Sequence, residues 1–168
     1  MFKTHTIISI LISGLIAVGC SSPEKKEPKH QPNRADISGL KIIADTIIYD
    51  VILRNIDTSD VWEAECLQYV DQKSLIDYLF DGIYSKRFVA VEFMGDKILS
   101  IDDVKSIENG DGFSRKLVSK VQFKERWYID SSGNFQKQII SYTLGIEAYS
   151  KQNSFLGHKA LFVVKPKL

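Results

Sequence analysis

Few residues in this chain have the types and spacing that catalysis requires. Two of the three histidines lie in the first 30 residues, and only His158 lies in the part expected to fold. A lone histidine in a loop is usually solvated, and no GxSxG, HExxH, CxxC or phosphate-loop spacing occurs. Asp102 and Asp103 follow Ser100 as the first turn of a helix would, which explains them without acid–base catalysis. The sequence therefore predicts no enzyme, no metal site and no cofactor.

The clearest chemical signal is a cysteine at the end of an apolar segment. Residues 7–18 are uncharged and mostly apolar, and Lys3 precedes them. A membrane-spanning helix needs roughly 20 apolar residues, so this shorter run suits an export signal. The run ends in Ala17-Val18-Gly19-Cys20, which resembles the lipobox of bacterial lipoproteins, where the cysteine thiol receives a diacylglycerol. We therefore expect a signal peptide at 1–19 and lipidation at Cys20; the alternative is an uncleaved helix with a chance cysteine.

The segment that follows Cys20 is polar. Residues 21–32 contain three prolines, charges of both signs and no aliphatic or aromatic residue, so they cannot bury enough surface to offset the entropy of ordering. We expect residues 20–39 to be a lipidated cysteine with a disordered tether, and residues 40–168 to be a single domain. Ser21, in place of an aspartate, favours the outer membrane by resemblance to lipoprotein sorting rules. The expected location is therefore the outer membrane, with the domain facing the periplasm.

The charge balance and the cysteine count limit the possible partners. The chain has 22 basic and 21 acidic residues, and without residues 1–19, which hold only Lys3, the two numbers are equal. No basic excess is left to neutralise phosphates, so nucleic-acid binding is not expected. Cys66 is the only cysteine besides Cys20, so acylation would leave no pair for an internal disulfide. We expect Cys66 to be a small buried side chain, with a disulfide to a partner as the alternative.

Apolar periodicity predicts the positions of several elements. The spacing of Leu75, Ile76, Leu79, Phe80 and Ile83 gives one apolar stripe and predicts a helix over about 74–85. The apolar run at 46–54 fits a buried helix or a strand, and its β-branched residues favour the strand. A short strand at 87–93, a helix that begins after Ser100 and a last strand at 159–165 are also predicted.

The strongest β-pattern lies at 121–147. Turn residues at 131–134 separate two strand-like segments, which predicts a long antiparallel hairpin. Strands that are neighbours in sequence, with a few separate helices, indicate an α+β fold. We predict an antiparallel sheet built around this C-terminal hairpin, with a few helices packed on it.

The hairpin also supplies the candidate core and interface residues. Trp127 shares one strand face with Val121, Phe123 and Ile129, so it is expected to anchor the core. Tyr128 must then point to the other face. A sheet edge on this hairpin would offer unpaired backbone groups to a neighbour, while its lysines would discourage uncontrolled pairing. The candidate interface residues are Gln122, Tyr128 and Gln138.

Three stretches resemble the PorN/GldN proteins, which are periplasmic ring subunits of the type IX secretion and gliding-motility machinery of Bacteroidetes. The segment Val121–Asp130, followed by Leu144-Gly145-Ile146, is similar to the family's "YxIKExWxFD…RxxGI". Ser74–Ile83 is similar to its "SLyDVLxxgI" helix, and Leu161–Val164 occupies the place of its "LFWxxFP". The chain lacks the family's "NxPLYYP" stretch before Ser74, has Val163 in place of the terminal tryptophan, and carries a lipobox of its own.

The resemblance implies a non-enzymatic lipoprotein that contributes protein–protein contacts to a secretion or motility assembly. Its expected partners are the membrane, through the lipid on Cys20, and other envelope proteins, among them a ring lipoprotein; a homo-oligomer is also possible. The alternative function is a stand-alone outer-membrane lipoprotein that binds a small apolar ligand or another envelope component.

Overall fold

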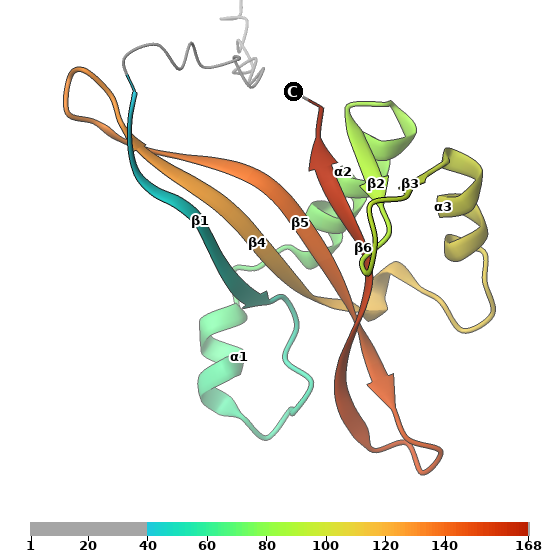
Figure 1. Cartoon of the computed structure of the whole chain (residues 1–168). Coiled ribbons are helices and arrows are strands. Elements are labelled where there is room, and N and C mark those ends of the chain that lie inside the picture. The colour runs from blue at the N-terminus through green and yellow to red at the C-terminus, as the bar shows by residue number, and fades with distance from the viewer. Residues whose placement is uncertain (1–39, 168) are drawn as a thin grey trace, which may run out of the picture. The chain divides into compact units, whose positions relative to one another are not determined.

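The structure is a computed structural model that describes residues 40–167. These residues form a six-stranded antiparallel sheet in the order β1-β4-β5-β6-β2-β3, accompanied by three α-helices (Figure 1). The predicted α+β fold, with an antiparallel sheet built around the C-terminal hairpin, is confirmed. The predicted signal peptide, the lipidation site at Cys20 and the tether lie outside the described residues.

The hairpin of β4 (Val118–Ile129) and β5 (Phe135–Tyr149) forms the middle of the sheet. Its turn closes with a backbone hydrogen bond from Asp130 N to Asn134 O (3.1 Å) and uses a left-handed Gly133. On its outer sides lie β1 (Lys41–Ile52) and β6 (Phe155–Pro166). The short strands β2 (Phe88–Val91) and β3 (Ile98–Leu99) complete the sheet beside β6. The ambiguous run at 46–54 is therefore a strand.

The helices begin where their capping residues predict. α2 (Gln72–Tyr84) begins after Asp71, whose carboxylate accepts from Ser74 N, and this helix confirms the prediction at 74–85. α3 (Ile101–Glu108) has a capping box between Ser100 and Asp103, as predicted from the same residues. A further helix, α1 (Val61–Leu67), is capped by Asp60, and a short 3₁₀ turn, η1 (Arg115–Leu117), leads into β4.

The core lies between α2 and one face of the sheet. The ring of Phe80 on α2 meets that of Phe162 on β6 edge-on, with centroids 5.7 Å apart. Val121 and Leu144 are cross-strand partners in this face, and both are fully buried. α3 adds Val104, which is also fully buried. Burial of this apolar set is the main stabilising contribution to the fold.

The antiparallel pairing gives the sheet two distinct ends. The upper end in Figure 1 collects the start of β1, the end of β4, the start of β5, the end of β6 and the start of β2. The lower end collects the opposite strand termini, and α1 follows the lower end of β1. Residue 40, where the described chain begins, therefore lies at the upper end, away from α1.

Candidate interaction surface

Buried polar side chains form a network near the lower end of the sheet. Glu147 is buried, and its carboxylate accepts from Arg54 Nε (3.0 Å) and from the hydroxyl of Tyr149 (2.5 Å). On the neighbouring strands, Ser119 Oγ lies 2.9 Å from Nε2 of His158. The network joins the segment after β1 to β4, β5 and β6, so it fixes the relative positions of these strands.

Two members of this network have lowered pKa values. Burial disfavours charge on Glu147, but hydrogen bonds, first of all that from Arg54, outweigh this effect and hold its pKa below the usual value. Burial, together with the nearby charge of Lys120, lowers the pKa of His158. Ser119 is fully buried, so the grouping of serine, histidine and glutamate presents no accessible nucleophile. The expectation that His158 is a solvated loop residue is wrong, because it lies in β6 and is half-buried.

A cavity of about 210 Å³ lies on the sheet above this network. The small residues Gly145 and Ala160 form part of its wall. A Cβ added to Gly145 would lie 3.3 Å from Cβ of Lys120, another residue of the wall. Lys120 and Gln122 line the cavity, and each donates to the carboxylate of Asp50 at 2.9 Å. The remaining lining residues are Phe93, Thr143, Leu144 and His158. This lining is mainly polar.

Trp127 does not anchor the core. It is half-buried, its ring meets Phe135 edge-on at 5.3 Å, and its Nε1 donates to Glu125 at 2.9 Å. The prediction that this face of β4 points toward the core is correct, because Val121, on the same face as Trp127, is fully buried. However, the buried cluster that includes α2 reaches only the lower part of β4. In the upper part of this face, where Trp127 lies, a buried carboxylate takes the place of the apolar cluster: Glu125 accepts a hydrogen bond from the hydroxyl of Tyr49 (2.7 Å).

The residues predicted for an interface on the hairpin are not freely exposed. Tyr128 is 3% exposed, and its hydroxyl donates to Gln138 at 2.7 Å. Its ring is therefore covered by other described residues of the chain. Gln122 and Gln138 are half-buried, and both are held by the hydrogen bonds given above. Contact of these glutamines with a partner stays a prediction.

The hairpin is a sheet edge over part of its length. β1 pairs with β4, but β6 pairs with β5 only from Tyr142 onward, so among the described strands residues 135–141 of β5 pair with β4 alone. Of the two edge strands, β1 and β3, β1 is the longer, and it exposes Ile42, Ile43 and Ile48. Register shifts interrupt this strand between Ile42 and Ala44 and between Asp45 and Ile47, and Thr46 has a φ of 73°. Such bulges discourage strand addition at an edge.

The most exposed apolar surface lies on and after α1. None of the seven residues of α1, all of them described, is buried. Val61 and Trp62 are 77% and 74% exposed, and Tyr69, just beyond the helix, is 89% exposed. We call Val61, Trp62, Tyr69 and the neighbouring Val70 the α1 surface. Its helix stands below β1 in Figure 1.

The α1 surface is surrounded by negative charge. Residues 55–72 contain no lysine or arginine. Their acidic residues are Asp57, Asp60, Glu63, Glu65 and Asp71. Cys66 is exposed here, so the prediction that it is a small buried side chain is wrong. Large aromatic residues are frequent in the energetically dominant part of interfaces, and monomeric proteins rarely leave such a group uncovered.

The residues described contain neither a helix long and apolar enough to cross a membrane nor a cluster of three or more metal-ligating side chains. Comparison of the chain with models of protein families, with curated proteins and with solved structures finds no match.

Periodicity alone could not find the α1 surface. α1 has only seven residues, which are too few to show a clear apolar stripe, and none of them is buried. A local signal was nevertheless present. Asp60 is a good N-cap, and Trp62 and Tyr69 stand in a stretch without basic residues. Aromatic residues in an acidic segment outside the predicted core indicate a binding surface.

Proposed function

We propose that this protein is a lipid-anchored envelope protein that works by binding other proteins, as an interaction subunit of a type IX secretion or gliding-motility assembly. In this proposal Cys20 carries the lipid, the outer membrane holds the protein, and the folded domain faces the periplasm. The resemblance of three stretches to the PorN/GldN proteins supports the choice of assembly.

The observation that carries the proposal is the α1 surface. A helix that buries none of its residues contributes little to the stability of its own domain. Exposed Trp62 and Tyr69 nevertheless have an unfavourable interaction with water that a partner would relieve. Burial of such aromatic residues gives protein interfaces much of their affinity.

The charges around the α1 surface indicate the chemistry of the partner. With five acidic and no basic residues between positions 55 and 72, this surface would repel an acidic protein. A suitable partner has an apolar groove or helix face flanked by lysines or arginines. The apolar part would bury the aromatic rings, and the basic residues would pair with the acidic residues around the α1 surface. The β1 edge is a weaker candidate because its bulges interrupt the pairing.

The alternative expected from the sequence is binding of a small apolar ligand. A cavity of about 450 Å³ beside α2 and η1, to which Ile76 and Arg115 contribute, has a mainly apolar lining and a suitable size, so it supports this alternative. The cavity on the sheet is small and is lined mainly by polar groups, among them Lys120, Gln122 and Thr143. Apolar ligands are usually held in larger, predominantly apolar pockets of about 300–1,000 Å³.

The experiment is site-specific photo-crosslinking in the native host, combined with substitution. A crosslinker at Tyr69 should trap a subunit of the secretion or motility assembly, and Trp62→Ala in the same chain should weaken the crosslinked product. Without a crosslinker, Trp62→Ala with Tyr69→Ala should impair secretion or gliding. Loss of one aromatic hot spot costs on the order of 2 kcal/mol, or about thirtyfold in affinity.

The matched control replaces two apolar residues that are exposed elsewhere. Met94→Ala with Leu156→Ala removes side chains that are 89% and 69% exposed but lie outside the α1 surface. The control variant should secrete and glide normally. If both double variants behave like the unchanged protein while remaining folded and membrane-bound, the α1 surface is not the interface.

A further inference from the structure

The two ends of the sheet differ in charge. At the upper end the segments 41–45 and 126–137 adjoin each other, and so do the segments 81–88 and 165–167, while β6 joins β5 only from Tyr142 onward. The four segments contain seven basic residues and three acidic ones, namely Lys41, Lys86, Arg87, Arg126, Lys137, Lys165 and Lys167 against Asp45, Asp81 and Asp130. At the lower end, residues 54–72 contain Arg54, which pairs with Glu147, and five acidic residues. Other segments at the lower end contain Arg115, Lys116, Lys120, Lys151 and Lys159. The upper-end segments therefore carry a basic excess, whereas the acidic charge of the lower end is confined to the segment around α1.

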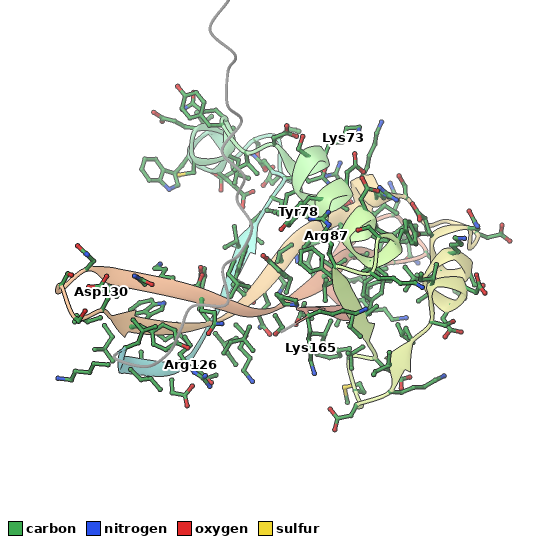
Figure 2. All side chains as sticks on the ribbon, turned by 90° about the horizontal axis from the view of Figure 1, so that it is seen from above. Lys73, Tyr78, Arg87, Arg126, Asp130 and Lys165 are labelled. Atoms are coloured by element: carbon green, nitrogen blue, oxygen red, sulfur yellow. The ribbon has the colours of Figure 1, made fainter. Side chains whose placement is uncertain are left out.

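Four of these basic residues form a compact cluster around the end of β6. Phe88 pairs with Pro166, and Lys167 N donates to Arg87 O at 3.1 Å, so Arg87, Lys165 and Lys167 lie on adjacent strands. Lys86 directly precedes Arg87, and all four basic side chains are exposed. Arg87 stacks over Tyr78, with its guanidinium carbon 5.1 Å from the ring centroid. Figure 2 looks down on this end, with Arg87 beside Tyr78 and Lys165 nearby.

Exposed apolar residues accompany this charge. Ile42 and Ile43 at the start of β1, and Phe135 at the start of β5, are each about half exposed. The hairpin tip, the start of β1 and the end of β6 reach a similar height in Figure 1. One flat surface could therefore touch all three regions. Basic side chains with interspersed apolar residues are typical of proteins that lie on anionic membranes.

We propose that the upper end of the sheet is a membrane-docking face that binds the anionic headgroups of phospholipids. This proposal rests on the lipid anchor of the proposed function, because the chain that leads from Cys20 joins the domain at this end. Residue 40 is twenty positions after Cys20, so lipid on Cys20 would hold the upper end closer to the bilayer than the lower end. The charges act over a Debye length of only about 8 Å, so they matter once the tether has brought them there.

Docking in this way would orient the α1 surface. The acidic α1 surface lies at the lower end, so it would point away from an anionic bilayer, both by geometry and by charge repulsion. The lipid alone would leave the domain free to rotate. The basic end would restrict this rotation and present Trp62 and Tyr69 to a partner in the periplasm.

The first test measures vesicle binding by the mature-length chain, residues 20–168, with Cys20→Ala to remove acylation. At about 50 mM salt this chain should sediment with vesicles of 70% phosphatidylcholine and 30% phosphatidylglycerol, and not with pure phosphatidylcholine. Lys86→Gln, Lys165→Gln and Lys167→Gln together should weaken binding on the order of 100-fold, because each lysine near such a surface contributes about fivefold.

The control replaces three exposed lysines away from the upper end, at Lys97, Lys116 and Lys151, by glutamine. This variant has the same net charge as the test variant and should bind nearly as well as the unchanged chain. Equal weakening by both triple variants, equal binding to both kinds of vesicle, or no binding at low salt would each overturn the proposed docking face. The assay contains neither acyl chain nor partner protein, so its failure would leave the α1 interface untouched.

A second test uses the two tryptophans as reporters of orientation. Trp127 lies in the upper part of β4 and Trp62 lies on α1 at the other end. In the acylated protein, reconstituted with the same anionic lipids, spin-labelled headgroups should quench Trp127 in the Trp62→Phe variant more than Trp62 in the Trp127→Phe variant. Equal quenching, or stronger quenching of Trp62, would contradict the proposed orientation.

Discussion

Gly82 is the position at which two physical effects predict opposite outcomes. It lies in α2, where an exposed glycine is about 1 kcal/mol less favourable than alanine. Gly82 is buried, however, and a Cβ built on it would lie 2.1 Å from Cδ2 and 2.4 Å from Cε2 of Phe88. Carbon atoms prefer separations of about 3.5–4.0 Å, so the ring would have to move by more than 1 Å.

The packing around Phe88 decides between the two effects. Its ring is confined between Tyr78, at a centroid distance of 5.3 Å, and Tyr142, at 6.3 Å. Overpacking in such a place costs about 1–3 kcal/mol and sometimes more. With a displacement of this size we take the upper end of that range. After the gain in helix propensity is subtracted, Gly82→Ala should lower the free energy of unfolding by about 2 kcal/mol.

Urea denaturation of the mature-length chain, followed by circular dichroism, measures this change. The midpoint should fall while the slope stays constant, because the surface exposed on unfolding is nearly the same. Phe88→Val removes the clashing ring atoms and provides the matched background. In that background Gly82→Ala should be neutral or should stabilise the protein by up to about 1 kcal/mol. A Gly82→Ala variant that is more stable than the unchanged chain would refute the reasoning.

Three further predictions follow from the buried network and the anchor. Arg54→Ala leaves the carboxylate of Glu147 buried without its charged partner, and because Arg54 is partly exposed the cost should be about 1–3 kcal/mol in the same urea titration. The control Arg126→Ala removes a surface ion pair and should cost less than Arg54→Ala. The pKa values of His158 and Glu147 are both lowered in the folded state, so stability should fall as the pH drops below about 6.5 and again below about 4.5, and His158→Gln should remove the first decrease. Cys20→Ala should release the protein from membranes after a high-salt wash; a variant that still pellets would show that lipid does not hold it.

The sequence alone predicts those helices and strands whose signal comes from residues close together in the chain. The 3.6-residue spacing of Ile76, Leu79 and Ile83 predicts α2, and all three side chains are buried. Ser100 with Asp103 predicts the start of α3, since a capping box involves only residues of one turn. Two strands joined by a short turn likewise predict the β4–β5 hairpin. These features depend on residues that are close in the chain.

Only the tertiary structure decided how far the core extends and which strands are covered. Alternation correctly placed Trp127 and Val121 on one face, but the buried cluster with α2 reaches only the lower part of that face, so Val121 is buried and Trp127 is not. Which parts of the hairpin are edges depends on β1, which is about 80 residues earlier in the chain than the part of β4 beside it, and on β6, which covers β5 only from Tyr142 onward. The basic upper end arises because antiparallel pairing joins the segments 41–45 and 126–137, and separately the segments 81–88 and 165–167, whose charges are scattered in sequence. Strand order and helix placement follow from long-range packing, and no local pattern of residue types contains that information.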